Sequence, residues 1–206
     1  MKFPSLQLQL RTTSVLFLLL FCKNLMSQEL FKKYTPGHYY TIDGEKITGL
    51  LKFNYTPTPY QPKPYGTSSI TFKENKKAKK VKLTTKEIVS FVIGQDTFTT
   101  AKDLHFHHVF NFKVTQDFVQ VISSGKINLY HYYASVGTGS PNESAKATYP
   151  FLFKENMPVH VRYKERKEII LKLIADFPQL YEELKNSENK SIDLKDVIDR
   201  YNQNWL

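Results

Sequence analysis

Three histidines in four residues are the side chains of this sequence with the clearest potential to bind a metal. His105, His107 and His108 open residues 105–114, whose alternating aromatic residues predict a β-strand. Side chains two residues apart in a strand share a face, so His105 and His107 would lie side by side and could bind one zinc ion. A catalytic zinc site needs a third protein ligand, and the sequence points to none. A metal-dependent hydrolase using His105 and His107 is one hypothesis; we favour surface or structural histidines.

A run of lysines is the second group with possible chemistry. Residues 73–82 hold six lysines and one glutamate, in a chain whose formal net charge is +10. Segments that predict strands, residues 69–73 and 81–83, flank the run, which favours a solvated hairpin tip. The alternative is adhesion, in which Lys76, Lys77, Lys79 and Lys80 contact anionic polymers of the cell envelope. The basic residues are not spread along a face with interleaved aromatic residues, so no nucleic acid is expected as a partner.

The amino-terminal residues 1–27 are typical of a secretory signal peptide. Lys2 and Arg11 give a positive start, residues 15–22 form an apolar run, and residues 25–27 provide a cleavage site before Gln28. The apolar run is far shorter than the roughly 20 residues that a membrane-spanning helix needs, and no longer run occurs later in the chain. We therefore expect export to the periplasm or the extracellular space, with no transmembrane segment in the mature chain.

The only cysteine of the chain, Cys22, lies within this predicted signal peptide. A lipoprotein anchored through Cys22 is the alternative, but Phe21 stands where such processing prefers a small residue. Cleavage would leave a mature chain with no disulfide, thiol nucleophile or thiolate metal site. No cofactor is expected.

Residues 28–163 are predicted to form a β-rich domain. Asp43-Gly44 marks a tight turn between strands at residues 38–42 and 46–55, and the second of these alternates apolar and polar residues. Four prolines in residues 56–66 predict a rigid connector. A second hairpin is centred on residues 123–126, and residues 134–148 have the composition of a surface loop.

Residues 164–206 change to a helical period and are predicted to pack on the same domain. Pro178 interrupts the first apolar pattern, and Ser191 is the expected N-cap of a last helix. Three aspartates of that helix are interpreted as its solvated edge rather than as a cation site, namely Asp193, Asp196 and Asp199. The predicted fold class is α+β: a mainly antiparallel β-sheet or small barrel followed by about three C-terminal helices.

The order of several short motifs resembles a family of uncharacterised exported proteins from Bacteroidetes-type bacteria. The resemblance covers about residues 37–202. Its landmarks are Gly37 with the Asp43-Gly44-Glu45-Lys46-Ile47-Thr48-Gly49 hairpin, Ile70-Thr71-Phe72, Glu87-Ile88 with Phe91, Gly125-Lys126 with Leu129-Tyr130, Phe177-Pro178 and Tyr201-Asn202. The resemblance implies an envelope or extracellular β-rich domain with C-terminal helices. It implies no activity and no catalytic residues.

The sequence contains no Gly-x-Ser-x-Gly elbow, His-Glu-x-x-His motif or phosphate-binding loop. The leading hypothesis is therefore a non-catalytic binding or structural module of the cell envelope or extracellular space, whose partner is a protein or a glycan. The metal-dependent hydrolase and adhesion through residues 73–82 are the two alternatives. The sequence predicts no oligomeric state.

Overall fold

A computed structural model describes residues 33–55, 68–106, 112–137, 144–155, 157–188 and 192–205. The predicted signal peptide, the proline-rich residues 56–66 and Ser191 lie outside these residues. No helix within the described part of the chain is long and apolar enough to span a membrane.

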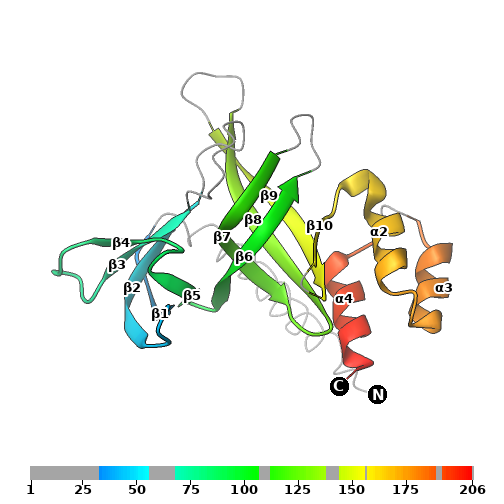
Figure 1. Ribbon diagram of the computed structural model, residues 1–206, viewed down its shortest axis with the longest axis horizontal. Helices are drawn as coiled ribbons and strands as arrows, with labels where there is room; N and C mark the ends of the chain where they lie inside the picture. Colours follow the sequence, from blue (N-terminus) through cyan, green and yellow to red (C-terminus); the bar gives the residue numbers. More distant parts are fainter. Residues whose placement is uncertain are drawn as a thin grey trace, which may run out of the picture.

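Ten antiparallel strands form one sheet, in the order β10-β9-β8-β7-β6-β5-β1-β2-β3-β4 (Figure 1). The strands are β1 Thr35–Thr41, β2 Lys46–Asn54, β3 Ser69–Lys73, β4 Val81–Leu83, β5 Ile88–Ile93, β6 Asp96–Phe106, β7 Phe112–Ser123, β8 Ile127–Gly137, β9 Ser144–Lys154 and β10 Met157–His160. Strands β1–β5 lie at one end of the molecule and the helices at the other, with β6–β9 between them. This arrangement confirms the predicted α+β class.

The sheet is open, so the small barrel that the sequence also allowed is wrong. Its two outermost strands are β10 and β4, which do not pair with each other. The sheet nevertheless curls, because the His160 ring of β10 comes within 5.6 Å of the Phe106 ring of β6, centroid to centroid. Aromatic packing therefore joins β10 to β6 where no strand pairing does.

The hairpin of β1 and β2 forms as the sequence predicts. Gly44 adopts a positive φ of 85°, which glycine tolerates without steric cost, and the Thr41 amide donates to the Glu45 carbonyl at 2.9 Å. Leu51 and Phe53 of β2 are buried with Phe91 and Phe98 in the core of this end of the molecule. The alternation of β2 thus sets which of its faces packs inward.

Two strand predictions are wrong in extent. Residues 105–114 are not one strand: β6 ends at Phe106, β7 begins at Phe112, and these two residues pair across a hairpin whose residues 107–111 lie outside the described part. Residues 134–148 are mostly strand rather than loop, because β8 and β9 pair from Ala134 with Ala147 through to Gly137 with Ser144. Pairing between strands, which local composition does not encode, decides both cases.

Three helices follow the sheet: α2 Arg166–Leu173, α3 Pro178–Asn186 and α4 Leu194–Gln203, after a short 3₁₀ turn η1 Tyr163–Glu165. Pro178 occupies the first turn of α3, where its missing amide costs nothing. The predicted N-cap Ser191 is wrong. Asp193 caps α4 instead, since its carboxylate accepts from the Lys195 amide at 2.9 Å and the Asp196 amide at 3.3 Å.

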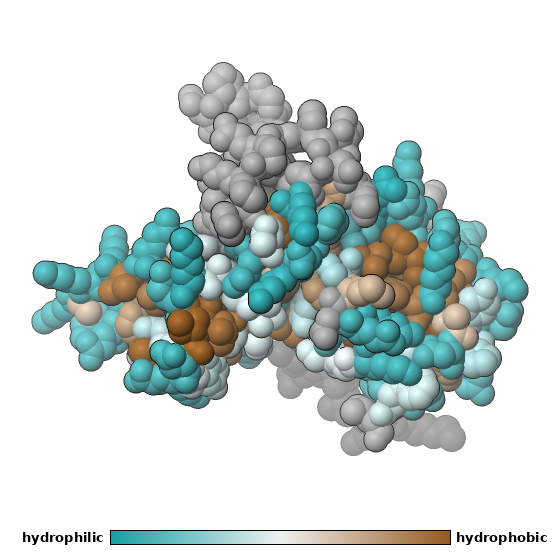
Figure 2. Space-filling model, in the orientation of Figure 1, coloured by the Kyte–Doolittle hydropathy of each residue, from teal (hydrophilic) through white to brown (hydrophobic). Residues whose placement is uncertain are grey.

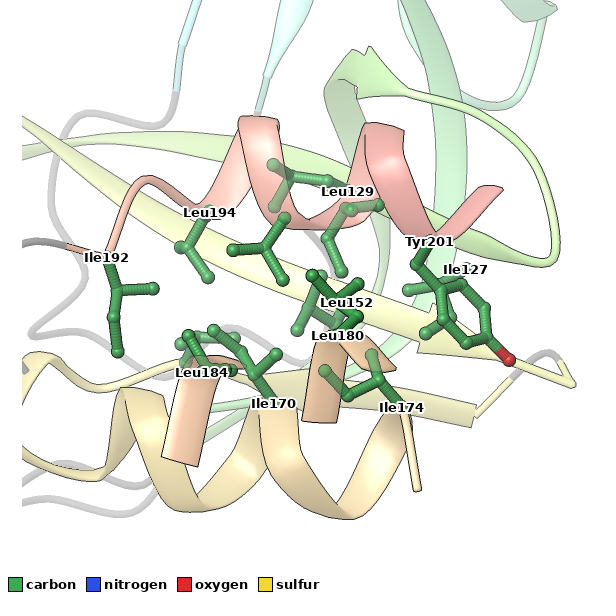
Figure 3. Close-up of a cluster of buried hydrophobic side chains, with 13 residues drawn as sticks. Ile127, Leu129, Leu152, Ile170, Ile174, Leu180, Leu184, Ile192, Leu194 and Tyr201 are labelled. Carbon is green, nitrogen blue, oxygen red and sulfur yellow. The ribbon is translucent and has the colours of Figure 1, made fainter. Parts of the chain in front are cut away.

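The helices pack on one face of β8 and β9 (Figure 3). Side chains from the strands, from all three helices and from the segments between them share this core, namely Ile127, Leu129, Leu152, Val161, Ile170, Ile174, Leu180, Leu184, Ile192, Leu194, Val197, Ile198 and Tyr201. Ile170, Ile174 and Ile198 are fully buried, so the apolar stripes of α2 and α4 are covered by the sheet and by each other.

Candidate functional site

The lysine run lies on the hairpin of β3 and β4, at the edge of the sheet farthest from the helices (Figure 1). The turn between these strands is held by its own hydrogen bonds. The Asn75 Oδ1 accepts from the Lys77 amide at 3.0 Å and the Ala78 amide at 3.1 Å, and Lys73 Nζ donates to the Lys76 carbonyl at 2.7 Å. An asparagine turn of this kind fixes the backbone from which the lysine side chains project.

Four amines of this turn are available to a partner. Lys76, Lys77, Lys79 and Lys80 are exposed, and Figure 2 shows hydrophilic side chains extending from this end of the molecule. Within the described residues, no ion pair joins these four lysines to a carboxylate. We refer to these four residues as the lysine tip.

The acidic residue beyond β4, Glu87, has another partner. Its carboxylate accepts from the Thr84 amide at 2.7 Å and the Thr84 hydroxyl at 2.5 Å, and these hydrogen bonds lower the pKa of Glu87. Concentrated positive charge attracts anions over a distance of about 8–10 Å at physiological salt. The exposed amines of the tip thus have the chemistry expected of a contact for anions.

Lys82, the last lysine of the run, has a structural consequence. Strand β4 is an edge strand of 3 residues, in which Val81 is 47% exposed and Lys82 is exposed beside it. Charged residues on a short edge strand discourage pairing with another chain. Lys82 thus helps to protect the sheet edge.

The predicted histidine pair is only partly within the described residues. His105 lies on the exposed side of β6, opposite Lys113, whose amine forms an ion pair of 2.6 Å with Asp103. His107 lies outside the described part. Within that part, no group of three histidine, cysteine or acidic side chains is placed to hold a metal ion. The amine opposite His105 is unfavourable for a cation there, and the two-histidine site stays a prediction.

The three aspartates of α4 each have a structural contact. Asp193 caps the helix, Asp196 lies 3.8 Å from the Arg200 guanidinium, and Asp199 pairs with Lys195 and accepts from the Ser123 hydroxyl. The contacts match the interpretation of these residues as the edge of an amphipathic helix.

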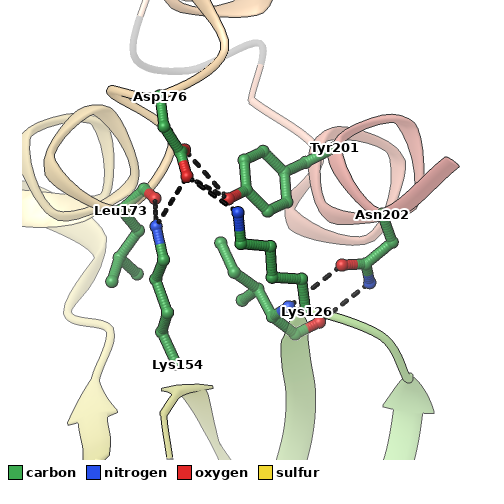
Figure 4. A network of polar contacts seen from close by, with 7 residues as sticks. Lys126, Lys154, Leu173, Asp176, Tyr201 and Asn202 are labelled. Atoms are coloured by element: carbon green, nitrogen blue, oxygen red, sulfur yellow. Dashed lines mark hydrogen bonds and ion pairs between the residues drawn. The ribbon is translucent and has the colours of Figure 1, made fainter. Parts of the chain in front are cut away.

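A polar network ties the helices to the end of the sheet (Figure 4). Asp176, just before α3, accepts from the Tyr201 hydroxyl at 2.9 Å and from Lys126 Nζ at 3.1 Å, and lies 3.4 Å from Lys154 Nζ. Burial raises the pKa of Asp176, but the hydrogen bonds from Tyr201 and Lys126 and the charge of Lys154 outweigh it and bring the pKa below its usual value. Asp176 carries no distinctive local signal, and sequence reasoning missed it.

Asn202, the residue after Tyr201, makes a second tie. Its side chain accepts from the Ile127 amide at 3.0 Å and donates to the Ile127 carbonyl at 2.8 Å, as a neighbouring strand would. A Cβ built on Gly125 would lie 2.4 Å from Asn202 Cγ, so only glycine fits beneath the amide. The Phe177 ring lies 6.5 Å from the Tyr201 ring, centroid to centroid. The motifs Gly125-Lys126, Phe177-Pro178 and Tyr201-Asn202, distant in sequence, thus meet where the helices dock on the sheet.

Comparison of the chain with protein-family models, with curated proteins and with solved structures finds no match. The resemblance to exported Bacteroidetes-type proteins therefore stays a prediction from the sequence.

Proposed function

We propose that the protein is a non-catalytic binding module of the cell envelope or extracellular space, and that it holds an anionic polysaccharide through the lysine tip. The observation that carries this proposal is the exposure of four amines on one ordered turn, with no carboxylate paired to them among the described residues. The predicted signal peptide supports a setting in which such polymers occur.

The sequence left a protein and a glycan open as partners, and the charge of the tip favours the anionic glycan. A protein interface is usually built around buried aromatic or apolar anchors. The lysine tip instead offers flexible point charges, which suit a polymer with repeated negative groups and no fixed shape. Lys73, at the base of the hairpin, is held by the turn itself and contributes charge rather than contact.

The size of the effect can be estimated from lysines at other anionic surfaces. Each lysine near an anionic membrane surface contributes about 1 kcal/mol, so four contribute about 4 kcal/mol, which is roughly a thousandfold in affinity. Replacing Lys76, Lys77, Lys79 and Lys80 together by glutamine should weaken binding of the purified protein to a polyuronate by at least about a hundredfold, since part of the attraction comes from Lys73 and Lys82.

The matched control replaces the same four residues by arginine, which keeps the charge and changes only the shape of the cation. The arginine variant should bind the polyuronate about as well as the native chain, and neither should bind a neutral dextran. Equal binding by the glutamine and arginine variants would overturn the proposal, as would equal binding to dextran.

A further inference from the structure

The outer face of strands β2–β4 carries a second set of lysines, apart from the lysine tip. Leu51 and Phe53, on either side of Lys52 in β2, are buried in the core of this end of the molecule. The residues on either side of Thr71 in β3 are buried in the same core. Side chains alternate along a strand, so Lys52 and Thr71 both point to the face opposite the core.

Strand pairing aligns these side chains in one row. Thr71 pairs with Lys52 of β2 on one side and with Lys82 of β4 on the other. Residues that lie directly opposite each other in a sheet present their side chains on the same face. Two strand spacings of about 4.8 Å place the Cα atoms of Lys52 and Lys82 roughly 10 Å apart. We call Lys52, Thr71 and Lys82 the lysine row.

The charge of the lysine row is not neutralised by its surroundings. Lys82 is exposed and Lys52 is partly exposed, and among the described residues neither amine forms an ion pair. Strands β1–β4 contain no aspartate or glutamate, and the nearest acidic residue along β3, Glu74, lies in the turn beyond the strand. The row thus presents an amine at each end that can meet an anion.

The middle of the row offers a hydrogen-bond donor. Asn54 Nδ2 donates to Thr71 Oγ1 at 2.9 Å, which occupies an acceptor site of the hydroxyl and orients it. A threonine hydroxyl also carries one O–H donor, which the Asn54 contact leaves for another acceptor. An oxygen-rich group placed between the two amines can therefore accept from Thr71.

The distance between the amines favours a ligand with two separated charges. Two lysines on one sheet face repel each other, and an anion at each of them offsets this repulsion. In an extended polysaccharide with a carboxylate on every second sugar, successive carboxylates are about as far apart as the two lysines. The neutral sugar between them carries the hydroxyl oxygens that Thr71 can reach.

We propose that the lysine row binds an acidic polysaccharide with carboxylates on alternate sugars, placing one carboxylate at Lys52, the next at Lys82 and the intervening sugar at Thr71. The proposal rests on the proposed function and deepens it. The lysine tip attracts an anionic polymer by charge alone, whereas the lysine row selects the spacing of the charges along it.

The test uses the variant in which the four lysines of the tip are replaced by glutamine, so that the row is measured by itself. A tetrasaccharide of alternating glucuronate and N-acetylglucosamine, with two carboxylates, is compared with the corresponding disaccharide, with one, by amide NMR shifts at about 0.15 M salt. The tetrasaccharide should shift the amides of Lys52, Thr71 and Lys82, with an affinity in the millimolar range. The disaccharide should bind roughly fivefold more weakly, since it reaches one lysine at a time.

Replacing Lys52 and Lys82 together by glutamine should weaken binding of the tetrasaccharide at least about tenfold, and replacing both by arginine should preserve most of it. Lys46→Gln is the matched control, because Lys46 is an exposed lysine on the same face of β2, roughly 20 Å along the strand from Lys52. It should leave the binding unchanged. An equal loss for Lys46→Gln, no loss for the double glutamine variant, or equal affinity for the two saccharides overturns the lysine row as a site.

The two proposals fail separately. If the lysine row is wrong and the lysine tip is right, replacing Lys52 and Lys82 by glutamine leaves polyuronate binding by the intact tip unchanged. If the tip is wrong and the row is right, the glutamine and arginine variants of the tip bind the polyuronate equally, and the tetrasaccharide still requires Lys52 and Lys82.

Discussion

Replacing Asn202 by alanine should destabilise the protein strongly, although the side chain belongs to the last helix and contacts no proposed ligand. The change removes both hydrogen bonds to Ile127, at 3.0 Å and 2.8 Å, and leaves a buried amide and a buried carbonyl without their partner. An unsatisfied buried backbone group costs about 1–3 kcal/mol, so the expected loss for the two groups is about 2–6 kcal/mol in the free energy of unfolding. Such a loss is a large part of the roughly 5–15 kcal/mol typical of a folded domain.

Denaturant unfolding of the purified protein measures this loss. Asn204→Ala is the control, because Asn204 is an exposed asparagine at the C-terminal end of the same helix. Gly125→Ala provides an independent probe, since its new methyl group would displace the Asn202 amide. Gly125→Ala should therefore cost much less in the Asn202→Ala background than in the native chain. A loss below about 0.5 kcal/mol for Asn202→Ala, or strictly additive effects of the two changes, would refute the account of how α4 docks.

Further changes probe the pH dependence and the metal hypothesis. The pKa of Asp176 is lowered in the folded state, so the ionised carboxylate stabilises the fold above its ordinary pKa of 3.8, and this stabilisation is lost as the pH falls through the folded pKa. Asp176→Asn should therefore lower the free energy of unfolding by about 1 kcal/mol at pH 7, a figure already reduced for solvent screening. The difference between variant and native chain should shrink near pH 3. Folding lowers the pKa of His131 from 6.5 to about 4, so the unfolded chain binds a proton at a higher pH than the folded chain does. The free energy of unfolding should therefore fall by up to about 1.4 kcal/mol per pH unit from pH 6.5 to 4. His131→Gln should flatten this slope when unfolding is measured across that pH range. Metal analysis of untagged protein should find the same substoichiometric zinc in the native chain and in the His105→Ala, His107→Ala double variant, whereas one zinc per native chain that the double variant lacks would establish the metal site.

The parts of the fold that the sequence predicts are those with local signals. Asp43-Gly44 sets the first hairpin through the positive φ of glycine, and the apolar stripe of α4 at Val197, Ile198 and Tyr201 sets its buried face. Each of these signals lies within about ten residues of chain.

The parts that escape prediction depend on partners far apart in sequence. Asn202 bonds to Ile127, 75 residues earlier, and no pattern near either residue marks the pair. Likewise, Gln120 comes to lie opposite His131 only because β7 and β8 pair. The lysine tip is the exception among the candidate sites, since its charge density is visible in the sequence and the structure adds its exposure and its ordered turn.

The salt dependence of polyuronate binding tests the central claim most directly, because exposed amines act through charges that salt screens. Between about 0.05 M and 0.2 M salt, the native chain and the arginine variant of the lysine tip should each lose at least roughly tenfold in affinity, as expected when several ion contacts release counterions. The glutamine variant, which keeps Lys73 and Lys82, should lose several-fold less than the native chain over the same range. An equally steep loss for the glutamine variant, or a native affinity that does not change with salt, would contradict the claim that the lysine tip holds the polymer.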